Sequence, residues 1–222
     1  SQAIIKIDGV AFAPDGLIGV QMLDQWNAVL DTAKNILMLP KGEVSEKTYA
    51  SAMQKQGAIV APFTKGVHSF GMVDVKIGEN VSSFMLDIGA GTSSLEPAIA
   101  KQVNLPVFKS GSGFGGAGQG KASNIDIVVA EQPIISKILR ISKMYFHVHS
   151  IGKVIEAPEG KEFGGILGVR PLARMGAMID FGSYSIIIPK RKPHKLDTSG
   201  MRKLSPEDLQ KMLKRGEPQE EK

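Results

Sequence analysis

Short apolar runs separated by glycine and polar turns dominate the hydrophobic pattern of the chain. The clearest pair lies at 63–77 and 81–86, on either side of the turn-forming triplet Gly78-Glu79-Asn80. Runs of this length between turn residues are typical of β-strands joined by a hairpin. Other segments include strand-like runs at 125–130 and 138–148 and short helical segments at 46–56, 96–103 and 206–215. The pattern predicts a mainly β fold with short helices.

A gap-free internal repeat relates residues 16–40 to residues 165–189. Identical residues occupy the pairs Gly16/Gly165, Gly19/Gly168, Val20/Val169, Leu23/Leu172, Ala28/Ala177, Asp31/Asp180 and Pro40/Pro189. Each copy has the pattern of a short buried strand, a tight glycine turn, one or two helical turns and a hairpin of apolar strands. The repeated Asp of each hairpin is interpreted as an ordinary turn residue. Two copies of one structural unit are therefore expected.

The run FMLDIGAGTSSL carries the residues with the clearest chemistry. Its apolar strand leads Asp87 into a turn that contains Gly89 and Gly91, and the hydroxyls of Thr92 and Ser93 follow. Glycine permits backbone angles closed to other residues and lets neighbouring chain approach closely. A carboxylate held at the end of a buried strand has its pKa set by the groups around it, which is typical of functional sites. A solvent-exposed Asp that opens a glycine turn is the alternative.

This run resembles the catalytic loop of the retropepsin-like aspartic peptidases. The family's Asp-Thr-Gly-Ala loop is matched by Asp87-Ile88-Gly89-Ala90, and Gly165-Ile166-Leu167-Gly168 is similar to the Ile-Leu-Gly signature that closes the same lobe. The resemblance spans residues 62–189 and implies a closed β-barrel lobe with short helices. It implies that Asp87 is catalytic and is supported by the loop residues Ile88, Gly89, Ala90, Gly91, Thr92 and Ser93.

The activity implied by the resemblance is that of an aspartic endopeptidase. Two Asp carboxylates about 3 Å apart share one proton, so one of them activates a water and the other donates to the developing oxyanion. Asp87 supplies one carboxylate, and the mechanism needs no metal or other cofactor. The family carries a flap hairpin where this chain has residues 111–120. Closure over an extended peptide or protein substrate is thus implied for Gly113, Phe114, Gly115 and Gly116, with a disordered glycine loop as the alternative.

The resemblance also implies two lobes, because each lobe of the family holds one catalytic Asp. Residues 1–40 match only the closing third of a lobe, so the counterpart of Asp87 is expected upstream of Ser1. We expect 1–40 to be the C-terminal part of a first lobe, 41–61 a linker, 62–189 a complete lobe and 190–222 a basic tail with a short helix. The second lobe then comes from an upstream segment of a longer chain or from a homodimer partner. A first lobe that has decayed to a remnant is the alternative.

Ile88 departs from the family pattern, which has Thr or Ser after the catalytic Asp. The hydroxyl of that residue hydrogen-bonds across the two lobes, and an isoleucine side chain has no such group. Each backbone group left buried and unpaired costs on the order of 1–3 kcal/mol. The competing hypothesis is therefore a non-catalytic peptide-binding or dimerisation module that keeps the aspartic protease fold.

Composition and charge exclude several kinds of site and partner. The absence of Cys excludes disulfides, thiolate metal sites and a Cys nucleophile. No apolar run approaches the roughly 20 residues of a membrane helix, so no transmembrane segment is expected. Residues 190–222 hold ten Lys/Arg and six Asp/Glu, most of the net charge of +5. This tail lacks interleaved aromatic residues, so no nucleic-acid partner is expected.

Two histidines on one predicted strand are a further candidate site. His147 and His149 are two residues apart on a predicted strand, a spacing compatible with a metal site, although a solvent-facing pair is favoured and no metal is assigned. The compartment is left open, since any signal peptide would lie upstream of Ser1.

Overall fold

The structure is a computed structural model that describes residues 18–40, 48–110, 125–150, 157–158 and 160–190. All of them belong to one compact unit that ends at Lys190. The helix predicted at 206–215 lies outside the described residues. No described helix is long and apolar enough to cross a membrane.

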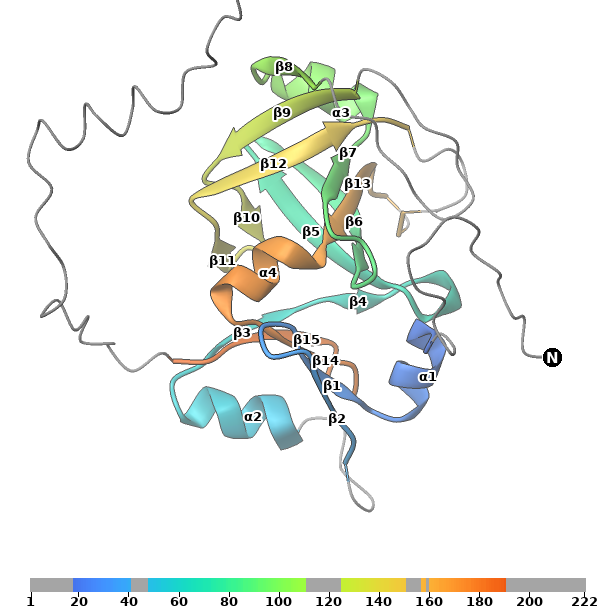
Figure 1. The fold of residues 1–222 in the computed structure, drawn as a ribbon, viewed down its shortest axis with the longest axis vertical. Helices are drawn as coiled ribbons and strands as arrows, with labels where there is room; N and C mark the ends of the chain where they lie inside the picture. Colours follow the sequence, from blue (N-terminus) through green and yellow to red (C-terminus); the bar gives the residue numbers. More distant parts are fainter. Residues whose placement is uncertain (1–17, 41–47, 111–124, 151–156, 159, 191–222) are drawn as a thin grey trace, which may run out of the picture. The chain divides into compact units, whose positions relative to one another are not determined.

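A curled sheet of ten strands forms the larger part of the first unit (Figure 1). Its strands are β4 (Thr64–Lys65), β5 (Gly71–Ile77), β6 (Asn80–Asp87), β7 (Ser93–Leu95), β8 (Val107–Ser110), β9 (Ile125–Glu131), β10 (Ile134–Ile135), β11 (Leu139–Arg140), β12 (Lys143–Val148) and β13 (Phe163–Gly168). The order is β11-β10-β5-β6-β13-β7-β12-β9-β8, and β4 also pairs with β5. The predicted hairpin at 63–86 forms as β5 and β6, whereas the run at 138–148 divides into β11 and β12. The mainly β fold class with short helices is therefore confirmed.

A second sheet of five strands is built mostly from the two copies of the internal repeat. The first copy contributes β1 (Val29–Asp31) and β2 (Ile36–Met38), the second contributes β14 (Met178–Asp180) and β15 (Ser185–Ile188), and β3 (Ile59–Pro62) is the fifth strand. The order is β2-β1-β14-β15-β3, with antiparallel neighbours throughout. Short helices precede the hairpins, α1 (Val20–Gln25) in the first copy and α4 (Val169–Met175) in the second. Each of the two segments thus contains a short helix followed by a hairpin.

The pairing of β1 with β14 relates the two copies by a local two-fold rotation. Leu30 lies opposite Ile179, its own counterpart in the repeat. Val29 lies opposite Asp180, which is the counterpart of Asp31, so the neighbouring pairs are exchanged as a two-fold rotation requires. An antiparallel strand pair has two-fold symmetry about its centre. The rotation axis therefore passes between Leu30 and Ile179.

The two hairpin turns are closed in the same way. The Asp31 Oδ1 atom accepts the backbone N–H groups of Ala33 and Lys34, at 3.1 and 3.0 Å. The Asp180 Oδ1 atom accepts those of Gly182 and Ser183, at 3.0 and 3.2 Å. The prediction that both residues serve as turn residues is confirmed.

The remaining helices cover the two sheets. Helix α2 (Thr48–Lys55) packs on the small sheet, where Ala50 belongs to the same buried cluster as Val29, Met178 and Ile187. Part of the segment 41–61 expected as a linker thus belongs to the folded unit, through α2 and β3. Helix α3 (Pro97–Val103) forms where 96–103 was predicted helical, and a short 3-10 helix, η1 (Val67–Ser69), precedes β5.

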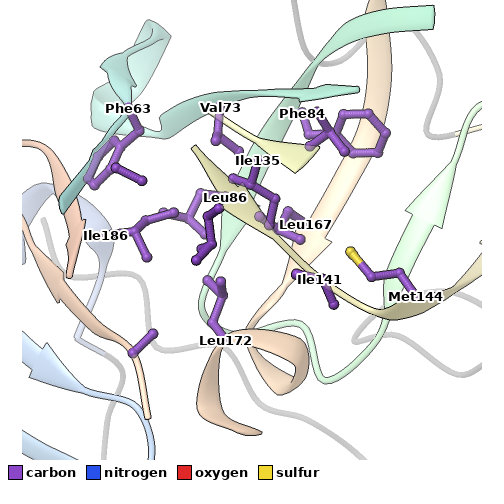
Figure 2. Close-up of a cluster of buried hydrophobic side chains, with 14 of the residues drawn as sticks. Phe63, Val73, Phe84, Leu86, Ile135, Ile141, Met144, Leu167, Leu172 and Ile186 are labelled. Atoms are coloured by element: carbon purple, nitrogen blue, oxygen red, sulfur yellow. The ribbon is translucent and has the colours of Figure 1, made fainter. Parts of the chain in front are cut away.

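One hydrophobic core joins the two sheets (Figure 2). Leu86 of β6, Leu167 of β13 and Leu172 of α4 are each at most 4% exposed, and Ile186 of β15 is fully buried beside them. Removing apolar surface from water stabilises by about 25 cal/mol per Å². The core therefore holds the end of β6 and the start of α4 in one rigid arrangement.

Candidate functional site

Asp87 is the last residue of β6 and is half-buried. Its Oδ1 atom accepts the backbone N–H groups of Gly89, at 2.8 Å, and Ala90, at 3.2 Å. These two bonds fix the orientation of the carboxylate. Within the described part of the chain no group donates a hydrogen bond to Oδ2. One carboxylate oxygen is thus held by the backbone, and the other is not engaged by any described residue.

The loop after Asp87 is clamped against the start of α4. Strand β6 pairs in parallel with β13, which places Asp87 opposite Gly168. The Val169 N–H group donates to the Ala90 carbonyl at 2.9 Å. A Cβ atom on Gly168 would lie 2.5 Å from the Thr92 carbonyl oxygen and 2.8 Å from that of Ala90, so this approach requires glycine. The two sequence signatures therefore form a single structural unit.

The hydroxyl of Ser93 supports the loop indirectly. Its Oγ atom accepts the N–H group of Gly168 at 3.1 Å in a buried position, and the Ser94 Oγ atom accepts that of Ile166 at 3.2 Å. Of the supporting residues named from the sequence, Gly89 and Ala90 contact the carboxylate itself. Gly91 and Thr92 instead line an adjacent pocket, together with Ser93.

Ile88 is half-buried and packs against the main hydrophobic core of its own unit. Hydrocarbon thus occupies the position where the retropepsin-like pattern has a hydroxyl. The Ile88 side chain has no polar atom, so it holds the loop by apolar packing alone. The hydrogen bonds of the loop come from the backbone groups of neighbouring residues.

The remaining candidates named from the sequence are the flap residues and the histidine pair. Gly113, Phe114, Gly115 and Gly116 lie outside the described residues. His147 is half-buried, and its pKa is lowered by burial and by the nearby His149, which favours the neutral imidazole near pH 7. Over the described ranges, no three or more His, Cys, Asp or Glu side chains form a group suited to a metal ion.

A polar cluster that sequence reasoning missed ties the first repeat copy to the rest of the unit. The Asp24 carboxylate of α1 accepts from Lys65 Nζ at 2.6 Å, from Ser69 Oγ at 3.0 Å and from the Tyr184 hydroxyl at 2.5 Å. The Lys65 ammonium also lies 6.0 Å from the centre of the Tyr184 ring. These residues are far apart in sequence, so no spacing reveals the cluster. It connects α1 to η1, β4 and the second repeat copy.

Asp24 makes stability depend on pH in a predictable direction. Burial acts to raise the pKa of Asp24, but hydrogen bonds from Lys65, Tyr184 and Ser69 outweigh it and hold the pKa below its ordinary value of 3.8. A carboxyl with a lower pKa in the folded state contributes stability above its unfolded-state pKa. That contribution is lost as the pH falls through the folded-state pKa. The cluster is thus formed near neutral pH and weakens in acid.

We expect Asp24→Asn to lower the free energy of unfolding near pH 7 by about 1–3 kcal/mol, because it removes a charge-assisted network. The variant should also lose less stability than the unaltered chain between pH 5 and pH 2. Urea unfolding at a series of pH values measures both effects. Asp126→Asn is the matched control, since among the described residues that carboxylate pairs only with the exposed Lys109 ammonium, at 2.6 Å. A pH profile for Asp24→Asn that parallels the unaltered chain would contradict the assignment.

Comparison with known proteins gives similarity at the level of structure. No protein-family model and no curated protein matches the sequence. The structure is similar to a retropepsin-like aspartic protease from Rickettsia conorii at 17% identity and a TM-score of 0.42, covering 60% of this chain and 89% of that one. It is also similar to EIAV protease, solved with the inhibitor HBY-793, at 20% identity and a TM-score of 0.32, covering 51% and 94%. Similarity this distant leaves the function to be argued from the site itself.

Proposed function

We propose that the chain is part of an aspartic endopeptidase in which Asp87 supplies one carboxylate of a catalytic dyad. The observation that carries the proposal is the environment of this carboxylate. Backbone N–H groups hold Oδ1 at 2.8 and 3.2 Å, while Oδ2 accepts no hydrogen bond from a described residue. Such a group is fixed in position yet has an oxygen free for proton transfer, as general acid–base catalysis requires.

The chemistry follows from bringing a second carboxylate to about 3 Å from Asp87. Two carboxylates this close cannot both ionise, so they share one proton. The ionised carboxylate takes a proton from a bridging water, whose oxygen then bonds to the peptide carbonyl carbon. The protonated carboxyl donates to the carbonyl oxygen as it becomes negative. When the C–N bond breaks, a proton passes to the leaving nitrogen, and an acid and an amine are released.

The local two-fold axis supports a definite place for the second Asp loop. Helix α4 starts beside the Asp87 loop, and the rotation that relates the repeat copies carries α4 onto α1. A counterpart loop would therefore lie against Gly19 and Val20. Ile18 at this place is 56% exposed, whereas its counterpart Leu167 is fully buried beside β6. We place the second lobe over this surface, contributed by an upstream segment of a longer chain or by a partner chain.

Gly19→Ala tests that placement. A Cβ atom on Gly19 would meet only Gln21 Oε1, at 3.3 Å, so we expect the free energy of unfolding to fall by less than about 1 kcal/mol. Where a counterpart loop packs as the Asp87 loop packs on Gly168, the same methyl group would clash with it. In the protein assembled with its second lobe, we then expect Gly19→Ala to lower the rate of peptide cleavage at least tenfold. Full activity of Gly19→Ala would show that no loop occupies this surface.

The activity is tested by digesting an unfolded protein from pH 3 to pH 7 and weighing the fragments by mass spectrometry. Cleavage that is blocked by a pepstatin-type inhibitor and absent in Asp87→Asn supports an aspartic endopeptidase. Cleavage that continues in Asp87→Asn rejects it.

Ile88 favours a second candidate, a peptide-binding or dimerisation module without catalytic activity. Its apolar side chain stands where the retropepsin-like pattern has a hydroxyl, so a polar link between two lobes is missing at this position. Saturable binding of extended peptides without hydrolysis at any pH would favour the module over the enzyme.

A further inference from the structure

A pocket of about 690 Å³ opens between α4 and β12, directly beside the Asp87 loop, whose residues Gly91, Thr92 and Ser93 form part of its wall. Both elements are labelled in Figure 1. Ile141 and Met144, which are only 8% and 1% exposed, give the pocket an apolar floor. The pocket is therefore suited to a ligand with an apolar part, and it is continuous with the candidate catalytic loop.

Positive charge surrounds this floor. The basic side chains that line the pocket are Arg140, Lys143, Arg170 and Arg174, and none of its described lining residues is Asp or Glu. The elements that carry them, β11, β12 and α4, approach the pocket from two sides. Clefts lined by one sign of charge focus the field and attract ligands of the opposite sign.

Three of the four cations, Arg140, Lys143 and Arg174, already interact with other groups. Lys143 Nζ lies 2.9 Å from Glu131 Oε1, and the Arg140 guanidinium donates to Gln132 Oε1 at 2.9 Å. Arg170 forms no hydrogen bond or ion pair with any described residue. Its Nη2 atom lies 3.6 Å from the position that a Cβ atom on Gly91 would take. Arg170 thus stands where the pocket meets the Asp87 loop, with its donors unengaged by the described chain.

We propose that this pocket binds a carboxylate of a peptide together with a neighbouring apolar side chain. Arg170 holds the carboxylate, because a guanidinium presents paired N–H donors that match the two oxygens. Ile141 and Met144 receive the apolar side chain. A nucleic acid fits less well, because phosphate backbones are bound along extended basic grooves, whereas these cations surround one apolar hollow.

This inference names a substrate class and rests on the proposed function only in treating the bound peptide as a substrate. An extended peptide advances about 3.3 Å per residue. A peptide that passes Asp87 and continues past Gly91 would bring a residue on one side of the cleaved bond to the pocket. We therefore expect preferred substrates to carry an acidic residue next to an apolar one at that position.

The test measures binding separately from cleavage. The full chain carrying Asp87→Asn is titrated against fluorescent octapeptides and followed by anisotropy. One peptide has a Leu-Glu pair and an amidated C-terminus, a second has Gln in place of Glu, and a third is the Gln peptide with a free C-terminus. We expect the Leu-Glu peptide to bind about tenfold more tightly than its amidated Gln twin, since a charge-assisted bidentate contact is lost. Restored affinity of the third peptide would identify a C-terminal carboxylate as an equally good source.

Arg170→Gln should remove this preference, reducing affinity for the Leu-Glu peptide by about tenfold and leaving the amidated Gln peptide unchanged. Lys76→Gln is the matched control, because Lys76 lies on β5, pairs with Glu79 at 3.1 Å and does not line the pocket. Equal binding of the Glu and Gln peptides, or an unchanged preference in Arg170→Gln, would overturn the proposal. So would displacement of the peptide by an equal concentration of oligo-dT. If Arg170 is present, equal binding of the Leu-Glu and Gln peptides refutes the pocket alone when the unaltered chain still cleaves peptides. A preference for the Leu-Glu peptide refutes the enzyme alone when the unaltered chain cleaves no peptide.

Discussion

Asp87→Asn is expected to lower peptide cleavage by about 10⁴-fold, the upper range for a positioned acid–base group. The amide has no basic oxygen that can take a proton from water, so the attacking hydroxide equivalent is not generated. Asn keeps a carbonyl oxygen at the position of Oδ1, so the hydrogen bonds from Gly89 and Ala90, at 2.8 and 3.2 Å, are retained. The measurement is the initial rate of fragment release from a peptide that the unaltered chain cleaves.

The loss of cleavage identifies a catalytic role for Asp87 only if the Asp87→Asn variant still folds. The free energy of unfolding of Asp87→Asn should stay within about 1 kcal/mol of the unaltered chain, because the turn keeps its backbone bonds. Asp126→Asn makes the same chemical change at an exposed ion pair on β9 and should keep full activity. Substantial cleavage by folded Asp87→Asn would rule out Asp87 as a member of the dyad.

Gly168→Ala is expected to destabilise the chain by about 2–4 kcal/mol and to reduce cleavage with it. The added Cβ atom would lie 2.5 Å from the Thr92 carbonyl oxygen, which belongs to the backbone and cannot rotate away. Relief requires the start of α4 to separate from the Asp87 loop. That movement stretches the bonds from Val169 N–H to the Ala90 carbonyl and from Gly168 N–H to Ser93 Oγ, now 2.9 and 3.1 Å. Urea unfolding and the rate of peptide cleavage measure the two effects.

The internal repeat supplies a matched control for this variant. Gly19 also precedes a helix and has nearly the same backbone angles, φ −75° and ψ 158° against φ −76° and ψ 162° at Gly168. Its added Cβ atom would meet one flexible glutamine side chain and no backbone. Any intrinsic cost of alanine at this position is therefore shared, and the difference between the variants reports the contact with the loop. In the 222-residue monomer, where no second lobe covers Gly19, equal destabilisation by Gly19→Ala and Gly168→Ala would show that this contact contributes nothing.

Local features of the fold were predictable from the sequence. The β5–β6 hairpin follows from two apolar runs around Gly78, and α3 lies where the pattern of 96–103 predicted a helix. The repeat predicted two hairpins with Asp turns, and Asp31 and Asp180 occupy them. Each of these features depends on residues within one turn or one hairpin, where local propensity and the hydrophobic pattern agree.

Contacts between distant segments were not predictable in this way. Ser93 is six residues from Asp87, which suggested a direct contact, yet its hydroxyl bonds to Gly168, 75 residues away. The Asp24 cluster joins residues separated by 41, 45 and 160 positions. Such pairings are set by strand order and by how the core closes, so tertiary packing decides them. The basic pocket belongs to the same class, because β11, β12 and α4 meet only in the folded unit.

The small sheet is symmetric at its centre and unequal at its edges. Strand β15 has β3 as its outer neighbour, but no described strand pairs with the outer side of β2, its counterpart in the repeat. Ile36 on β2 and Leu39 just after it are 48% and 53% exposed. An uncovered strand edge with apolar side chains is a template for pairing with another chain. Association of chains through β2, edge to edge, is therefore the expected route by which this polypeptide would aggregate.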